Sequence, residues 1–369
     1  MLTPPSRFVV SVHRGAAGHR ALRERWDALA ADVGARFFCT WGWYDAFLAA
    51  LEPDPERVLF ACLEDGGALV AIVPLREERV VRRGVPIRQL GLPRHDHLPL
   101  AGVPCRDALS LDELLDALAA GLRAAGVPWD ALVLSHVLAE GLFAQPPARW
   151  GWRTQLGHVK TCDEVACDAW DAFAARLSAN FRSNLNKAKN KLAKERDVRF
   201  GVAESAAAMA ELFPHFAALE AAGWKGKAGT AIAQDARLEA FYRRLIDDFA
   251  PTGAVCMPYL WLGDRLIAAQ LSFVDNETLY VDKLTYDETQ SKLAPGNLLL
   301  KHVIAAGTWK RVNLVGSPDW FQQWSPTKTD VIRVTAFNAT ARGALLLAEA
   351  RAKAIAKPLY QRLRAVRTG

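Results

Sequence analysis

The chain has 369 residues, of which 51% are hydrophobic and 23% charged, and its formal net charge is +6. This is the composition of a globular protein; the length predicts two domains, and no apolar run is long enough to span a bilayer. The opening MLTPPSRFVVSVHRG lacks the basic head and apolar block of a secretory signal, so we expect a cytoplasmic protein.

The first half of the sequence predicts helices around an antiparallel meander. HRALRERWDALAADVG and WGWYDAFLAAL are typical of helices. RVLFACLEDGGALVAIVPLREERVV predicts two strands joined at Asp65-Gly66-Gly67, with a third strand continuing the meander. LDELLDALAAGLRAAG predicts a helix ending near Gly126, and WDALVLSHV is the apolar strand that follows it.

A basic helix opens the second half, in the stretch RLSANFRSNLNKAKNKLAKERDVRF. Apolar residues recur there at three- and four-residue steps, at Leu177, Phe181, Leu185, Ala188 and Leu192. The remaining positions are rich in lysine and arginine, so the helix has a basic outer face. That face fits either solvent exposure or an acidic partner such as CoA phosphates, nucleic acid or an anionic membrane.

The second half repeats the order of elements seen in the first. AMAELFPHFAALEAAGW and DARLEAFYRRLIDDFA predict helices. AVCMPYLWLGDRLIAAQLSFVDNETLYVDKLTY predicts a three-strand meander with turns at Gly263-Asp264 and Asp275-Asn276, and RVNLVGS predicts a later strand. The hairpins CLEDGGALVAIVPL and WLGDRLIAAQLSF resemble each other. We therefore expect two related domains of mixed α/β class, residues 1–160 and 161–369.

The stretch YVDKLTYDETQSKLAPGNLLLKHVI changes character twice. A strand from Thr278 to Tyr286 passes into a polar loop, and an amphipathic helix begins at Pro295-Gly296-Asn297. This is either an ordinary strand-to-helix connection or an anion site, because a helix N-terminus presents unpaired N–H groups and the positive end of a dipole.

The cysteines and histidines do not predict a metal site. Cys162 and Cys167 are the only close pair among six scattered cysteines, and no second pair or histidine cluster completes a zinc site. His95 and His97 lie on either side of Asp96, but a third ligand is missing. We expect reduced thiols and no metal.

Several segments resemble a known group of enzymes. They are NFRSNLNKAKNKLAKERDVRF, AAGWKGKAGTAI, GDRLIAAQLSF, TLYVDKLTYDETQSKLAPGNLLL and LVGSPDWFQQWSPTK in the second half, with FFCTWGWYDAFL, LVAIVPL and RHDHLPLAG in the first. The sequence is similar to the CelD-type (cellulose-biosynthesis-associated) acetyltransferases of the GNAT superfamily. Tandem GNAT-like domains also occur in the Fem-type aminoacyl transferases.

The resemblance implies two tandem GNAT-like domains, with a degenerate first copy and a catalytic second one. It implies acetyl-CoA or a longer acyl-CoA as donor, its pyrophosphate held at the helix start by Lys292, Pro295, Gly296, Asn297 and Leu298. The usual pyrophosphate loop of the superfamily reads Gln/Arg-x-x-Gly-x-Gly/Ala. Here that position reads SKLAPGNLL, and only Gly296 and Lys292 stand in for it.

Direct acyl transfer from a thioester to an amine needs a base for the amine, N–H donors for the oxyanion and a proton for the thiolate. By strand alternation Asp282 shares a face with Tyr280, Leu284 and Tyr286, where it could act as base or form a cross-strand ion pair. Tyr286 could orient the substrate, protonate the thiolate or merely pack at the strand end. Glu220 is a second candidate base.

Two loops have the composition of an acceptor site. GWKGKAG places an indole between lysines and glycines, and GSPDWFQQWSPTK follows a predicted strand, where α/β proteins place their sites. The first loop could equally be a helix C-cap followed by a solvated turn. The expected substrate-binding residues are Trp224, Lys225, Lys227, Tyr280, Asp319, Trp320 and Lys328.

These observations predict an acyl-CoA-dependent N- or O-acyltransferase acting on a small or envelope-linked acceptor, such as an amino sugar or amino acid, in polysaccharide or cell-envelope biosynthesis. One alternative is a Fem-type transfer from aminoacyl-tRNA, with the basic helix reading RNA phosphates; otherwise we expect no nucleic-acid partner. Another is a non-enzymatic module that binds anionic polymer or membrane through the basic helix and the tail RAKAIAKPLYQRLRAVR.

Overall fold

The computed structural model describes residues 7–367, with side chains as far as Ala356, and is mixed α/β as predicted. It divides into two compact units. The first holds the described residues up to Ala35, Asp54–Val159 and the described residues from Asp330 onward; the second holds Arg36–Pro53 and Lys160–Thr329. Most side chains of the predicted basic tail, those of residues 357–367, lie outside the described part.

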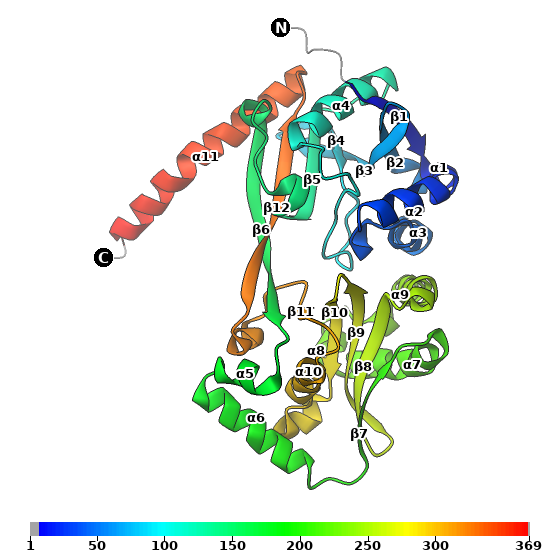
Figure 1. Ribbon diagram of the computed structural model, residues 1–369. Helices are drawn as coiled ribbons and strands as arrows, with labels where there is room; N and C mark the ends of the chain where they lie inside the picture. The colour runs from blue at the N-terminus through cyan, green and yellow to red at the C-terminus, as the bar shows by residue number, and fades with distance from the viewer. Residues whose placement is uncertain (1–6, 368–369) are drawn as a thin grey trace. The chain divides into compact units, whose positions relative to one another are not determined.

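The first unit is built on a sheet in the order β1-β2-β3-β4-β5-β12 (Figure 1). Its elements are β1 (Val9–Arg14), α1 (Gly15–Ala21), α2 (Arg23–Asp32), β2 (Val58–Asp65), β3 (Ala68–Arg82), β4 (Val85–Gly91), α4 (Leu111–Ala124), β5 (Ala131–Leu138) and α11 (Ala341–Arg367). The predicted meander β2-β3-β4 is confirmed, because β2 pairs with β3 and β3 with β4 in antiparallel register.

Helix α4 covers one face of this sheet because its leucines fall on one side. Leu114, Leu118 and Leu122 are buried in the same apolar cluster as Leu59 and other strand residues. Ser110 caps the helix: its side chain accepts from the N–H of Glu113, whose carboxylate accepts in return from the N–H of Ser110.

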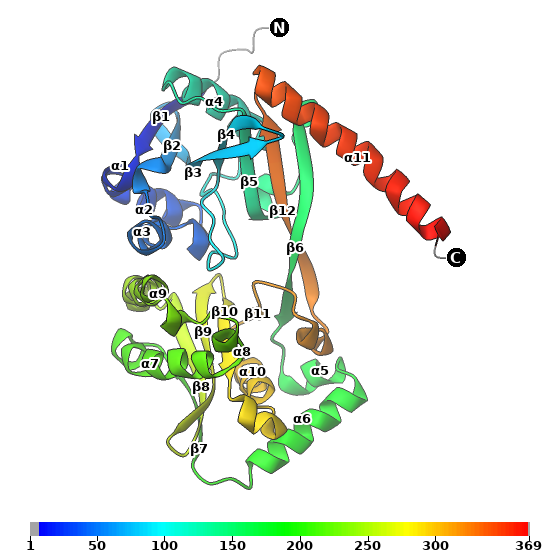
Figure 2. The same ribbon diagram turned by 180° about the vertical axis from the view of Figure 1, so that it is seen from behind.

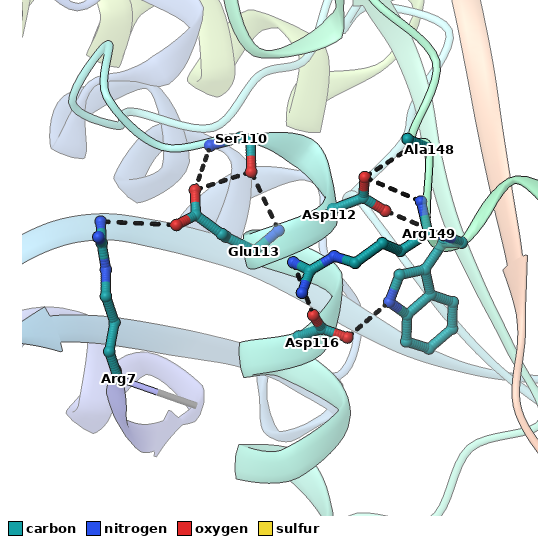
Figure 3. Close-up of polar contacts among 8 residues, drawn as sticks. Arg7, Ser110, Asp112, Glu113, Asp116, Ala148 and Arg149 are labelled. Carbon is teal, nitrogen blue, oxygen red and sulfur yellow. Dashed lines mark hydrogen bonds and ion pairs between the residues drawn. The ribbon is translucent and has the colours of Figure 1, made fainter. Parts of the chain in front are cut away.

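Carboxylates on α4 also fix the segment that leads into β6 (Figure 3). Asp112 accepts backbone hydrogen bonds from Ala148, Arg149 and Trp150 at 2.7–3.1 Å. Asp116 accepts from the indole N–H of Trp150 at 2.8 Å and pairs with Arg149 at 2.9 Å. One helix face therefore satisfies three consecutive backbone donors of a loop.

The second unit is built on a sheet in the order β6-β11-β10-β9-β8-β7. Its elements are α3 (Trp41–Ala50), α5 (Trp170–Ala175), α6 (Ala179–Leu192), β7 (Val198–Ala203), α7 (Ala206–Ala222), α8 (Trp224–Lys227), α9 (Ala236–Phe249), β8 (Val255–Leu262), β9 (Arg265–Asp275), β10 (Thr278–Tyr286), α10 (Pro295–Ala306) and β11 (Arg311–Asn313). The predicted meander β8-β9-β10 and the helix starting at Pro295 are confirmed.

Each face of this second sheet has its own helices (Figures 1 and 2). Leu279 and Val281 of β10 share an apolar cluster with Leu300 and Val303 of α10, and α6 adds Phe181 to it. Helices α7 and α9 contact the sheet from the other side. The predicted basic helix is confirmed as α6, whose apolar positions are all buried while its lysines are exposed.

The chain passes between the units at residues 35/36, 53/54, 159/160 and 329/330. The third point falls where the sequence predicts a single domain boundary, and the other three are not anticipated by it. Phe37 holds the early segment in the second unit, since its ring stacks on Phe273 of β9 at 4.6 Å. Strands β6 (Thr154–Ala166) and β12 (Thr327–Phe337) each have residues in both units, and β12 pairs with β5 in the first.

No helix in the described residues is both long enough and apolar enough to cross a membrane. The six cysteines, all within the described range, form no disulfide. Burial raises the pKa of the Cys62 thiol to about 12 and that of Cys256 to about 12, so both stay protonated at neutral pH.

Phe37→Ala should loosen the second unit. Removing a fully buried aromatic ring is expected to cost about 3–5 kcal/mol of unfolding free energy. Because Phe37 packs on β9, amide hydrogen exchange should accelerate in β9 and β10 and stay unchanged in β2 and β3. Leu345→Ala, at a half-exposed position, is the control. Faster exchange in β2 and β3, with β9 unaffected, would contradict the assignment of residues 36–53 to the second unit.

Asp130→Asn should change how the free energy of unfolding depends on pH. Burial raises the pKa of Asp130, but hydrogen bonds from Arg88 and Thr340 outweigh it and leave the pKa at about 2. A depressed pKa contributes stability that is present above the unfolded value of about 3.9 and is lost as pH falls through the folded value. Thermal unfolding at pH 5 and pH 2 should therefore show the wild-type advantage over Asp130→Asn shrinking. An unchanged difference would refute this account.

Candidate functional site

Strands β10 and β11 separate after a short parallel contact. They pair only over Thr278–Tyr280 and Arg311–Asn313. The chain after β11 stays beside β6, with which β11 is already paired: the N–H of Leu314 donates to the carbonyl of Asp163, and the N–H of Asp163 donates to the carbonyl of Gly316. From Val281 to Tyr286, β10 thus pairs with β9 on one edge and is not paired with β11 on the other.

A β-bulge interrupts β10 at the point where the strands part. Val281 pairs with Ser272 and Lys283 with Leu271, which leaves Asp282 as the extra residue. The predicted alternation fails here. Leu284 packs into the cluster of α10, while Asp282 lies on the opposite face beside Tyr242 of α9. Strict alternation from Tyr280 to Tyr286 was wrong because the bulge shifts the pleat by one residue.

The carboxylate of Asp282 is buried, with its side chain 1% exposed. Its Oδ2 accepts a hydrogen bond from the Tyr242 hydroxyl at 3.3 Å and lies 3.9 Å from the ammonium of Lys283. Its Oδ1 has no hydrogen-bond partner among the described residues. A buried carboxylate oxygen with a free lone pair is a strong acceptor for a proton or an N–H.

Two neighbours set the electrostatics around Asp282. Burial, with the charge of Asp282 second, raises the pKa of Tyr242 well above its usual value, so the phenol stays protonated and donates. Burial lowers the pKa of Lys160, on which the charges of Asp282 and Lys283 also act in opposite directions. The Lys160 ammonium donates to the carbonyl of Val315 at 2.7 Å, in the segment that leaves β11.

A pocket of about 250 Å³ opens at the start of α10. Its lining residues are Leu284, Tyr286, Ser291, Ala294, Pro295, Gly296, Asn297 and Trp320. No side chain caps α10, and its N-cap residue Ala294 has a left-handed backbone with φ of 46°. The N–H groups of the first turn are therefore not satisfied by a capping side chain, as an anion site requires.

Gly296 faces Tyr286 in this pocket. A Cβ added at Gly296 would lie 3.5 Å from Cδ1 of Tyr286, an ordinary contact distance. The Tyr286 ring is 39% exposed and forms the wall opposite the helix start. Of the predicted donor-binding residues, Pro295, Gly296 and Asn297 line the pocket, whereas Lys292 is exposed outside the lining and Leu298 faces a different hollow.

A buried carboxylate organises the loop that brings Trp320 to the pocket. Asp163, fully buried, accepts hydrogen bonds from Ser317 at 3.0 Å and from the amide of Gln322, and pairs with Lys328 at 3.2 Å. Trp320 lies within this clasped segment and is 37% exposed. Lys328 thus supports the loop. Among the described residues, this network does not include Asp319, whose side chain is exposed.

The GWKGKAG segment is held by two carboxylates. Glu220 is buried, pairs with the Lys225 ammonium at 2.5 Å and accepts from the N–H of Ile232 at 2.9 Å. Glu288, in the loop after β10, accepts from the N–H of Trp224 at 2.8 Å and pairs with Lys227 at 3.1 Å. Both oxygens of Glu220 are engaged, so the structure favours a structural role for it over that of a base.

The predicted site residues therefore separate into groups. Tyr286 and Trp320 meet at the pocket, and Asp282 lies at the bulge of the same strand. Trp224, 62% exposed, is tied to the loop after β10. Tyr280 is not brought to the pocket, because its ring packs against Phe37 and its hydroxyl bonds to Arg36.

Four residues of the site were missed by the sequence analysis: Lys160, Asp163, Tyr242 and Lys283. Lys283 follows Asp282 in the sequence, and regular strand alternation would put it on the opposite face. Only the bulge at Asp282 places Lys283 on the same face. The other three come from elements whose contact with β10, or with the segment after β11, has no local sequence signal. In the described residues, no group of His, Cys, Asp and Glu could hold a metal ion.

A sequence comparison identifies the domain that contains β10, α10 and Tyr242, the larger part of this site. Residues 179–309 match the family model described as an acetyltransferase (GNAT) domain. The match starts at the first residue of α6, ends just beyond α10 and lies wholly in the second unit. The domain defines the protein as an acyltransferase. A search of curated proteins finds no match to the chain.

Solved structures extend the likeness of fold to most of the chain. FemX aligns with a TM-score of 0.59 at 10% identity, covering 88% of this chain and 98% of that one. A conserved protein of unknown function from Bacteroides thetaiotaomicron gives 0.53 at 12%, covering 86% and 97%. L-PGS from Bacillus licheniformis gives 0.50 at 11%, covering 89% and 96%. The predicted tandem GNAT-like fold is thereby confirmed.

Asp163→Ala should release the loop that holds Trp320. The change removes the buried carboxylate that accepts from the hydroxyl of Ser317 and the amide of Gln322 and pairs with Lys328, at a total cost of about 1–3 kcal/mol. Limited proteolysis should then cut within residues 316–326 faster than in wild type. The Asp319→Ala variant, changed in the same loop but outside the network, should be cut at the wild-type rate. Equal protection of all three proteins would argue against the clasp.

Proposed function

We propose that the protein is an acyl-CoA-dependent acyltransferase that moves an acetyl or longer acyl group onto an amine of a small or envelope-linked acceptor; a hydroxyl acceptor would use the same chemistry. The second unit carries the reaction, and the first is a degenerate copy of the same fold. The observation that carries the proposal is the unpaired edge of β10 ending at an uncapped helix start, within a GNAT domain.

The donor fits this opening by its chemistry. The pyrophosphate of acyl-CoA is an anion suited to the N–H groups of Gly296 and Asn297, with Lys292 as a nearby cation. The unpaired edge of β10 offers backbone groups to the amides of the pantetheine arm and an N–H to the thioester carbonyl. Tyr286 and Trp320 supply apolar walls. An acyl-CoA in this position would place its thioester near the bulge.

Direct transfer then needs no covalent enzyme intermediate. The acceptor nitrogen attacks the thioester carbon, the C–N bond forms and the C–S bond breaks. Asp282 takes the proton from the amine, with Tyr242 and Lys283 holding its carboxylate in place. Tyr286, on the pocket wall, gives a proton to the leaving thiolate. The ammonium of Lys283 adds positive charge beside the oxyanion that forms in the transition state.

The exposed face of α6 supports a second candidate, transfer from aminoacyl-tRNA. Lys187, Lys189, Lys191 and Lys194 form no ion pair in the described part of the chain, so their charges are available to phosphates. This candidate predicts activity that is destroyed by ribonuclease and a protein that does not respond to CoA thioesters.

The donor assignment is tested by thermal unfolding with acetyl-CoA and longer acyl-CoAs. Ligand binding to the folded state stabilises the protein and so raises its melting temperature. At a free ligand concentration of one hundred times Kd, the free energy of unfolding rises by about 2.7 kcal/mol. The shift should persist in Gly296→Ala, since a Cβ fits there, and be lost in Gly296→Glu, whose charge opposes the phosphates. Equal shifts in both variants would place the donor elsewhere, and no shift in wild type would remove acyl-CoA as donor.

The role of Asp282 is tested by kinetics on whichever amine the wild type acylates. Asp282→Asn should lower kcat by about 10²–10⁴-fold, the usual contribution of a general base, and leave the acyl-CoA affinity near its wild-type value. Tyr242→Phe should have a smaller effect, because it removes one hydrogen bond to the base. Full activity of Asp282→Asn would show that the base is another group or water.

A further inference from the structure

A second hollow lies on α10, one turn beyond the residues that line the donor pocket. It has a volume of about 500 Å³ and lies between α6, β7 and α10. Leu192, Val198, Phe200 and Leu298 give it an apolar surface, and Lys189 and Lys301 supply cationic groups. Its volume is within the range of small-molecule sites, about 300–1,000 Å³. Apart from Lys189, which the aminoacyl-tRNA candidate uses, none of its lining residues takes part in the chemistry proposed above.

The two lysines of this groove lack an acidic partner. Neither Lys189 nor Lys301 forms an ion pair in the described part of the chain, although Lys301 lies 4.6 Å from the ring centre of Trp170. Burial, and after it the charge of Lys189, lowers the pKa of Lys301, which indicates that the two cations act on each other. Two unpaired like charges beside an apolar surface are stabilised by an anion placed between them.

The other polar groups of the lining limit the charge that fits. Glu195 also lines the groove and carries a negative charge, so the balance favours one anionic group over a polyanion. His302 stacks on Phe200 at 4.6 Å, and burial lowers its pKa, so it is uncharged at neutral pH. It can still donate or accept one hydrogen bond.

We propose that this groove binds an amphipathic anion: an acyl or aryl body carrying a single phosphate or carboxylate. The anionic group lies between Lys189 and Lys301, and the apolar body rests on Leu192, Phe200 and Leu298. The ligand enters as a single molecule and not as part of a bilayer. The apolar residues of α6, such as Phe181 and Leu185, are buried against α10 and its neighbours, so the helix has no apolar face left to insert.

Calorimetric titration with n-octyl phosphate below its micelle concentration tests the proposal. Wild type should bind it, and should not bind inorganic phosphate, which lacks the apolar body, or octyltrimethylammonium, which has the opposite charge. Lys301→Ala should weaken binding by about tenfold or more, as expected for loss of a charge-assisted contact. Ala305→Trp should abolish it by filling the groove, since Ala305 is an exposed lining residue.

Two controls separate this site from its surroundings. Lys187→Ala removes a cation of the same helix outside the groove and should leave the affinity unchanged. Gly296→Glu should retain octyl phosphate binding even where it loses acyl-CoA, so failure of the donor assignment and failure of this one are distinguishable. The proposal would be overturned if Lys301→Ala, Ala305→Trp and wild type bound octyl phosphate with equal affinity. It would also be overturned if the protein bound anionic phospholipid vesicles but not monomeric octyl phosphate.

Discussion

The separation of β11 from β10 is the constraint on which the site depends. Three residues of parallel pairing fix where the strands meet. The antiparallel pairing of β11 with β6, continued by the backbone bonds between Asp163 and the segment after β11, keeps that segment on β6. The buried carboxylate of Asp163 then gathers the following loop. A single residue of β6 thus diverts the chain through its backbone and anchors the loop through its side chain.

The bulge at Asp282 makes the two faces of the opening chemically different. On one face, Asp282 and Lys283 lie beside the hydroxyl and ring of Tyr242. On the other, Leu284 and Tyr286 lead to the start of α10. A regular strand would have put alternate residues on each face and separated Asp282 from Lys283. Because both lie together, a carboxylate and a cation are available at the point where the proposed thioester would lie.

Local sequence pattern was enough to predict most helices and strands, but not which of the two units each segment belongs to. The meanders, the helix at Pro295 and the basic helix follow from periodicity and turn residues. Residues 36–53 belong to the second unit through distant contacts, among them the stacking of Phe37 on Phe273 and the ion pair of Asp45 with Arg244. Both contacts span more than half the chain, and no local signal reports them. Strands β6 and β12 were missed for the same reason, since their partners are distant in sequence.

The candidate site was predicted in part, for a similar physical reason. Gly296, Asn297 and Asp282 lie on β10 or the helix that follows it, where spacing along the chain places them. Glu220 has the carboxylate that a base needs, but its two oxygens are bonded to Lys225 and to a backbone N–H. Only the packed structure reveals these partners. Tyr242 and Lys160 reach Asp282 from an α-helix and a strand far apart in sequence, so their role could not be read from either segment alone.

Hydrogen exchange of the protein with and without acetyl-CoA tests the central claim most directly, because it reports where the donor binds. The account predicts slower exchange in residues 281–298, which form the free edge of β10 and the first turn of α10, and unchanged exchange in β2 and β3. Protection confined to the first unit, or binding that leaves residues 281–298 unprotected, would contradict it.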